Sequence, residues 1–169
     1  LPYHLDNYSK LHNLNLTDQP YLESQIASIS DDIAYNNHDV EDAIRANLIN
    51  LEQLSDINFF NNIILELKEQ YKDISDKQLL YQVLRNSMSK MVNDIHKNSS
   101  KNLNSNFHTI KDIQNYTTFV IKFSEKMKNN FKIIKNFLKI NVYNHKNLLD
   151  KRNYSKKVVH KLFSYFKYN

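Results

Sequence analysis

Three polar side chains, Asp31, Tyr35 and Asp39, follow one another at intervals of four residues in the stretch LESQIASISDDIAYNNHDVEDAIRA, residues 22–46. In a helix each step of four turns the chain by only about 40° and rises about 6 Å, so a carboxylate, a phenol and a second carboxylate can line one wall of a pocket. The same stretch carries a helical stripe of apolar residues: Leu22, Ile26, Ile29 and Ile33. The sequence therefore predicts a helix with one side buried and polar groups for chemistry on another.

The 169 residues include neither cysteine nor glycine. Without Cys the chain has no disulfide, no thiolate nucleophile and no Cys-ligated zinc, a composition that suits the cytoplasm. Without Gly it cannot form a Walker A loop or a GxGxxG turn, because both need glycine for backbone amides to approach phosphates. Any phosphate chemistry must therefore use metal ions and side chains.

The ends and the apolar runs of the sequence indicate where the protein works. No apolar run approaches the roughly 18 residues of a membrane span. The start, LPYHLD, has neither a signal-peptide pattern nor an initiator Met. We expect a cytoplasmic protein with no membrane partner, and we interpret the chain as a piece of a longer one.

The net charge of +5 is unevenly distributed. Residues 1–100 hold 8 Lys/Arg and 15 Asp/Glu, a net charge of −7, whereas residues 101–169 hold 15 and 3, a net charge of +12. Basic residues interleaved with Phe and Tyr can follow a nucleic-acid backbone, so nucleic acid is one partner to consider. The alternative is a Lys- and Asn-rich composition that only decorates solvated helix faces.

Helical periodicity recurs along the chain, and no segment alternates as a half-buried strand does. We expect an extended lead-in over residues 1–16, and then a helix capped by Thr17 or Asp18 and ending near a kink at Asn36 and Asn37. Further helices are expected at 39–47, 51–54, 57–72, 76–97, 111–129, 131–143 and 155–167. The predicted fold class is all-α.

Composition divides the chain into three parts. Residues 1–97 form the expected helical core, and residues 98–107, NSSKNLNSNF, read as a polar linker. Residues 108–169 form a basic helical region.

The stretch SDDIAYNNHDVEDAIRA, preceded by Glu23 and Gln25, resembles a signature of the bacterial deoxyguanosine triphosphate triphosphohydrolase-like proteins of the HD superfamily. Weaker similarity continues through LLYQVLRNSMSKMVNDI, FVIKFSEKM and FLKINVYNHKNLL. The resemblance implies an HD-type helical domain of which this chain is the C-terminal part. That family builds its metal site from an early His, a later His-Asp pair and a distant Asp, and the segment that would supply the first three is not in this sequence.

The resemblance also assigns roles to single residues. Asp31 matches the distant Asp, a ligand of a divalent ion such as Mg²⁺ or Mn²⁺, whereas the simpler explanation is a solvated helix aspartate. Tyr35 and Asp39 match positions that hold the deoxyribose of the substrate, although Tyr35 also suits a core position. Arg45 and Arg85 are candidates for a phosphate contact, but Arg45 is as well explained by pairing with the acidic residue one turn earlier.

Two further details qualify the match. The residues His12, His38, Asp39 and Asp94 could be assembled into a second metal set, but the flanking sequence makes the His38-Asp39 pair a feature of the expected helix start. Asn47 stands where the family has Gly, a replacement that a helix C-terminus tolerates.

By resemblance, the intact protein would be a homo-oligomer that hydrolyses a dNTP to a deoxynucleoside and inorganic triphosphate. This chain supplies only one of the four metal ligands, so we expect the isolated chain to be inactive and cannot name a catalytic residue in it. The alternatives are a subunit completed by a separately encoded N-terminal half, a decayed remnant, or a helical module that binds nucleic acid through its basic region.

Overall fold

The computed structural model describes residues 3–12 and 18–168, and within these ranges the chain forms helices and loops without a strand. The elements are α1 (Tyr3–Leu11), α2 (Leu22–Arg45), α3 (Leu51–Ser55), α4 (Asn58–Gln70), α5 (Asp76–Asn106), α6 (Ile110–Gln114), α7 (Glu125–Leu138), the π-helical turn η1 (Lys139–Tyr143) and α8 (Lys146–Tyr168). The predicted all-α class is confirmed. The helices expected at 51–54, 57–72 and 155–167 are present as α3, α4 and part of α8.

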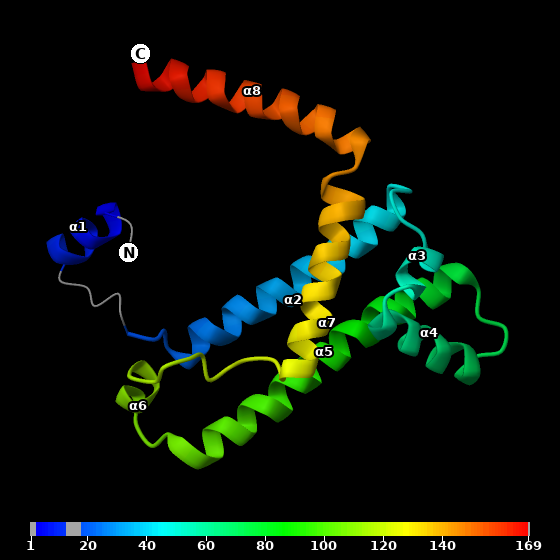
Figure 1. Ribbon diagram of the computed structural model, residues 1–169, viewed down its shortest axis with the longest axis horizontal. Helices are drawn as coiled ribbons and strands as arrows, with labels where there is room; N and C mark the ends of the chain where they lie inside the picture. The colour runs from blue at the N-terminus through cyan, green and yellow to red at the C-terminus, as the bar shows by residue number, and fades with distance from the viewer. Residues whose placement is uncertain (1–2, 13–17, 169) are drawn as a thin grey trace.

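The core lies where α2, α4, α5 and α7 meet (Figure 1). Helix α5 packs against α4 and α2, and α7 packs across α2. The side chains of Val40, Leu54, Ile63, Val83 and Leu138 are completely buried. Burial of apolar surface is the main favourable contribution to folding, so these contacts fix α2 and leave its remaining surface for other roles.

Helices α1 and α8 lie apart from this core (Figure 1). α8 leaves the end of η1 and projects outward, and none of its described side chains is buried. Although α8 has 23 residues, no helix in the described ranges is both long and apolar enough to cross a membrane. The prediction of an extended lead-in is wrong over Tyr3–Leu11, which is α1, whereas residues 13–17 lie outside the described part of the chain.

Helix α2 is continuous, so the predicted kink at Asn36 and Asn37 is wrong. Both side chains are buried, at 2% and 5% exposure. Asn37 Nδ2 donates to Ile33 O at 2.9 Å, and Asn37 Oδ1 accepts from Ser87 Oγ of α5 at 2.5 Å. The Asn37 side chain thus has partners in a carbonyl of its own helix and in a neighbouring helix. It therefore does not draw backbone groups out of the hydrogen bonds of α2, and the helix continues.

The two ends of α2 differ in how they are closed. Tyr21 is the N-cap residue and makes no side-chain cap, so the predicted cap at Asp18 is wrong, while Thr17 lies outside the described residues. At the other end Asn47 has a φ of 53°, and its N–H donates to Ile44 O at 3.0 Å. Leu48 N–H donates to Ala43 O at 2.9 Å. These two bonds form a Schellman motif, in which Asn occupies the left-handed position that glycine usually takes.

The stretch predicted as a polar linker, 98–107, is helical up to Asn106, so its interpretation as a loop is wrong. Its polar side chains hold the loop that precedes α7. Asn98 Nδ2 donates to Lys122 O at 3.0 Å, and Lys122 N–H donates to Ser99 Oγ at 3.2 Å. The helix expected over 111–129 is correspondingly split, because α6 ends at Gln114 and α7 begins only after the N-cap residue Ser124. The division into domains stays a prediction.

Candidate functional site

The three polar residues at intervals of four lie on one continuous helix, α2. Asp31 is exposed, Tyr35 has 62% of its surface exposed, and Asp39 is half-buried. The apolar residues of α2 that enter the core, Ile33, Val40 and Ala43, occupy a different part of its circumference. One helix thus carries the series, and its lining a pocket stays a prediction. The predicted buried stripe is wrong in part, because only Ile33 is buried in the core, whereas Ile26 is 49% exposed.

Asp39 is held from outside α2 by Tyr143 of η1. The Tyr143 hydroxyl donates to Asp39 Oδ2, across 104 residues of sequence. Burial, followed by the hydrogen bond and charge of Asp39 and by the nearby Tyr35, raises the pKa of Tyr143 above its ordinary value. Tyr143 therefore remains a protonated donor at neutral pH, and the second oxygen of Asp39 keeps its capacity to accept from another group.

Sequence reasoning missed Tyr143. Its only signal was its position in FLKINVYNHKNLL, one of the segments that carries the family resemblance. Nothing local connects it to Asp39, because the contact depends on η1 continuing from α7 and on α7 packing against α2.

Asp32 turns away from Asp31 and joins α2 to α7. Its Oδ1 lies 2.8 Å from Lys135 Nζ, and the same ammonium group lies 4.8 Å from the centroid of the Phe131 ring. Both partners of the ion pair are about half exposed, so the pair contributes little to stability on its own.

Asp31 is the one predicted metal ligand, and the residues present do not form a complete site around it. In the part of the chain that the structure describes, no group of three or more His, Cys, Asp or Glu side chains could hold a metal ion. Metal sites in proteins draw on several protein ligands, so a single exposed carboxylate does not fit a catalytic ion. The assignment of Asp31 as a ligand stays a prediction.

The second metal set, His12, His38, Asp39 and Asp94, is wrong, because the structure gives these residues separate partners. His38 Nδ1 lies 3.8 Å from Glu41 Oε2 on the same helix. The Asp94 carboxylate accepts from the backbone N–H and the hydroxyl of Ser124 at 2.8 and 2.7 Å. Asp94 thus fixes the start of α7, and the His12 ring contacts the Tyr8 ring of α1.

The two candidate arginines differ in their surroundings. Arg45 pairs with Glu41 at 2.7 Å, as its spacing of four residues predicts. Hydrogen bonding with Tyr81 of α5, followed by the charge of Glu41, raises the pKa of the Arg45 guanidinium. Arg85 lies exposed on α5. A structural role is therefore established for Arg45, and phosphate contact by either residue stays a prediction.

Comparison with known proteins agrees with this architecture. Residues 121–169, which include α7, η1 and α8, match the family model described as the phosphohydrolase-associated domain. This similarity covers the C-terminal part of the chain and is consistent with its all-α fold.

Curated relatives give the resemblance its particular name. The chain is 41% identical over 153 residues to the deoxyguanosinetriphosphate triphosphohydrolase-like protein of Pelagibacter ubique, covering 90% of this chain and 41% of that protein. It is 36% identical over 137 residues to the protein of the same name from Rickettsia prowazekii, covering 80% of this chain and 36% of the relative. The resemblance seen in the sequence is confirmed, and the chain spans about two fifths of the length of these relatives.

Proposed function

We propose that this chain is the part of a metal-dependent dNTP triphosphohydrolase that contributes the distal metal ligand Asp31 and the deoxyribose contacts Tyr35 and Asp39. The observation that carries the proposal is the similarity of nine tenths of the chain to proteins named for this activity. It is supported by α2, which presents the three side chains in series beside one another.

The chemistry of the two sugar contacts follows from their surroundings. The free oxygen of Asp39 can accept from the 3′-hydroxyl of a deoxyribose, while Tyr143 holds the carboxylate in place. The exposed Tyr35 ring can pack on the sugar, and a ring packed there would favour a sugar without bulk at its 2′ carbon. The metal ion would polarise the phosphate and supply the attacking water, but three of its ligands would come from residues outside this chain.

Complementation tests this proposal. The 169-residue chain is assayed for triphosphate release from dGTP with Mg²⁺ or Mn²⁺, alone and mixed with the part of the Pelagibacter ubique relative that the alignment leaves uncovered. We expect no activity from the chain alone, because one carboxylate cannot hold the ion, and metal-dependent activity from the mixture. Asp31→Ala should abolish that activity, while Asp73→Ala, which removes an exposed aspartate elsewhere, should not.

Two results would contradict the proposal. Metal-dependent release by the chain alone above the Asp31→Ala control would show that the site is complete within these residues. Activity of the mixture that Asp31→Ala leaves intact would show that Asp31 is not a ligand. A 1:1 complex in the mixture would support a subunit completed by a separate half, and sedimentation of the complex would test the expected homo-oligomer.

The exposed helix α8 favours a second function, nucleic-acid binding. Its 23 residues include seven Lys or Arg and one Asp, and its aromatic side chains Tyr154, Phe163 and Phe166 are 68–76% exposed. Basic and aromatic groups together suit a phosphate backbone and unstacked bases. Binding to single-stranded DNA that weakens steeply with salt would support this function, and binding insensitive to salt would contradict it.

A further inference from the structure

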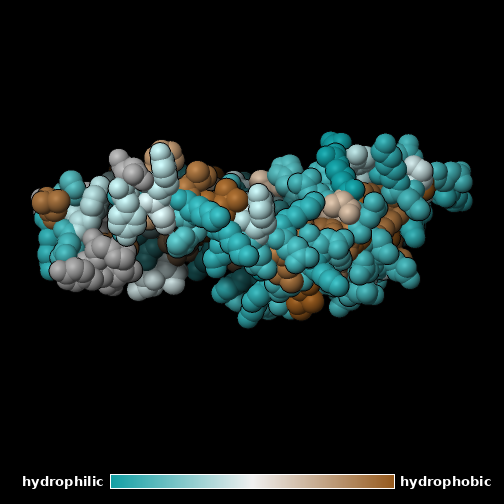
Figure 2. All heavy atoms as spheres, turned by 90° about the horizontal axis from the view of Figure 1, so that it is seen from above, coloured by the Kyte–Doolittle hydropathy of each residue, from teal (hydrophilic) through white to brown (hydrophobic). Residues whose placement is uncertain are grey.

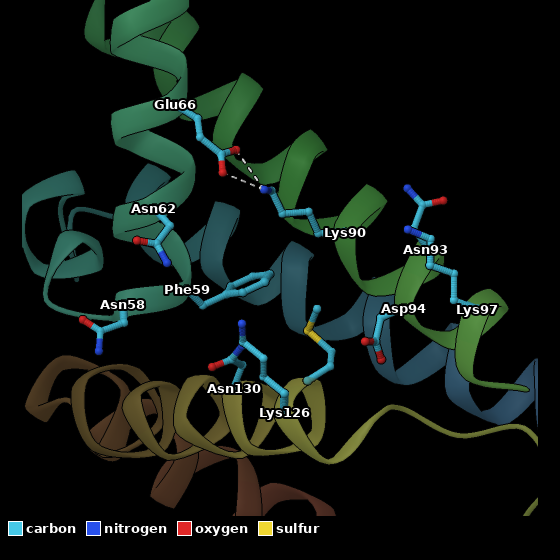
Figure 3. Close-up of a pocket in the computed structure, with 11 residues that line it drawn as sticks. Asn58, Phe59, Asn62, Glu66, Lys90, Asn93, Asp94, Lys97, Lys126 and Asn130 are labelled. Atoms are coloured by element: carbon cyan, nitrogen blue, oxygen red, sulfur yellow. Dashed lines mark hydrogen bonds and ion pairs between the residues drawn. The ribbon is translucent and has the colours of Figure 1, made fainter.

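A cleft of about 700 Å³ opens between α4, α5 and α7 (Figure 3). The residues proposed for the metal and the sugar do not line it. Phe59 of α4 and Met127 of α7 contribute apolar surface to its lining, and the two residues are only 7% and 9% exposed. The volume falls within the range of roughly 300–1,000 Å³ that small-molecule sites occupy.

Both carboxylates of the cleft already have partners. Lys90 Nζ donates to the two carboxylate oxygens of Glu66, at 3.0 and 2.8 Å. Asp94 is engaged by the backbone N–H and the hydroxyl of Ser124. Lys90 balances the charge of Glu66, whereas the neutral donors of Ser124 leave Asp94 with its negative charge. With Lys97 and Lys126 the lining keeps a net charge of +1 (three lysines against two carboxylates).

Two lysines that line the cleft are without such partners. In the ranges that the structure describes, neither Lys97 of α5 nor Lys126 of α7 takes part in an ion pair, and both are exposed. Lys126 rises from α7 toward Phe59, whereas Lys97 lies at the outer end of the α5 wall beside Asn93 (Figure 3). The two lysines thus line the cleft from two different helices.

Amide groups complete the polar lining. Asn58 and Asn62 stand one turn apart on α4, Asn93 belongs to α5, and Asn130 lies on α7 one turn after Lys126. Each amide offers two N–H donors, and each ammonium group offers three. With its carboxylates engaged, the lining is rich in donors and suits a ligand that is negatively charged and carries many acceptor oxygens.

We propose that this cleft binds a polyphosphate group, with Lys126 and Lys97 contacting its charge and the amides of Asn62 and Asn130 donating to its oxygens. A chain of linked phosphates can engage cations from α5 and α7 at once, which a single small anion cannot do to the same extent. This chemistry is shared by inorganic polyphosphate and by nucleoside triphosphates. The site is independent of the function proposed for α2.

Titration calorimetry on the 169-residue chain tests the site, with inorganic triphosphate as the ligand in one arm and ATP in the other. We expect binding that weakens with ionic strength, because the contacts are charged and open to solvent. Lys97→Gln/Lys126→Gln should weaken it about tenfold, since each exposed lysine contributes a modest charge-assisted contact. Asn130→Asp, which introduces a negative charge of nearly the same size and shape, should weaken it as well.

The matched control is Lys111→Gln/Lys132→Gln, which removes the same charge from exposed positions of α6 and α7 outside the cleft. Circular dichroism of each variant confirms that the helices are retained. Binding of both ligands identifies the phosphate chain as the recognised group, and binding of ATP alone identifies a nucleoside triphosphate as its source. Failure of both to bind, or equal loss of affinity in the two double variants, would overturn the proposal.

Discussion

The hydrogen bond between Tyr143 and Asp39 gives the most direct test of how the candidate site is held. Tyr143→Phe removes the hydroxyl and keeps the ring. A hydrogen bond to a charged partner stabilises a protein by about 1.5–3 kcal/mol, but both residues are only half-buried, so solvent screens part of this contribution. We expect the free energy of unfolding to fall by about 1–2 kcal/mol, which for a chain of this size lowers Tm by roughly 2–8 °C.

The same substitution changes the dependence of stability on pH. In the folded chain the pKa of Tyr143 is raised, because burial and Asp39 both disfavour the phenolate. The unfolded chain releases this proton near pH 10, the ordinary value for tyrosine, while the folded chain retains it to higher pH. The contribution of the protonated phenol is therefore fully present below about pH 10 and is lost as the pH rises above that value. Phenylalanine has no such proton.

Urea unfolding followed by circular dichroism, at several values of pH from neutral to above 10, measures both effects. The matched control is Tyr154→Phe on α8, where the side chain is 71% exposed. The difference in stability between the parent chain and Tyr143→Phe should be constant up to about pH 10 and then shrink. Two results would refute the role assigned to this hydrogen bond. One is an equal free energy of unfolding for Tyr143→Phe and Tyr154→Phe. The other is a difference between the parent chain and Tyr143→Phe that stays the same above pH 10.

Three further substitutions test polar contacts that order the ends of helices and loops. Gln25 Oε1 accepts from the backbone N–H groups of Val120 and Ile121, in the loop before α7, at 2.9 and 3.1 Å. Gln25→Met leaves these buried donors without an acceptor, so urea unfolding should show a free energy of unfolding lower by about 2–4 kcal/mol. Gln70→Met on the exposed surface should not reproduce this loss. Asn47→Ala should lower the unfolding free energy by about 1 kcal/mol because of its positive φ, while Asn47→Gly should not. The pKa of Asp112 is lowered by hydrogen bonds from two backbone N–H groups, so the protection of the α6 amides, relative to their intrinsic exchange rates at each pH, should fall as the pH drops below about 3.8; Asp112→Asn should not show this acid dependence.

Local patterns were sufficient to predict the central elements of the fold. In α4 the residues Phe59, Phe60, Ile63, Ile64 and Leu67 recur at helical spacing, and the structure buries all of them. The predicted start of α5 at Asp76 is confirmed, and the structure adds a capping box there between Ser75 and Gln78. Both signals depend on neighbours within one or two turns, which is the range that a sequence pattern contains.

Two of the wrong predictions, the kink in α2 and the loop over 98–107, share a physical cause, since polar side chains were taken to mark breaks in the helices. Asn37 and Ser99 each satisfy their polar groups against a distant segment, the first with Ser87 and the second with Lys122. Whether Asn or Ser interrupts a helix depends on the partner that it finds. That partner is set by tertiary packing, so composition alone gave a kink in α2 and a loop in α5 where the chain is helical.

The different surroundings of the three site residues follow from the geometry of α2. A spacing of four falls about 40° beyond a full turn, so the series Asp31, Tyr35 and Asp39 rotates by about 80° around the helix. Asp32 lies about 100° from Asp31, which brings it to nearly the same side as Asp39. That side faces α7 and η1, where Lys135 donates to Asp32 and Tyr143 donates to Asp39. Because the series rotates around the helix, Asp39 reaches Tyr143 while Asp31 stays exposed to solvent. The proposed role of Asp31 requires this exposure, since its further metal ligands would approach from another surface.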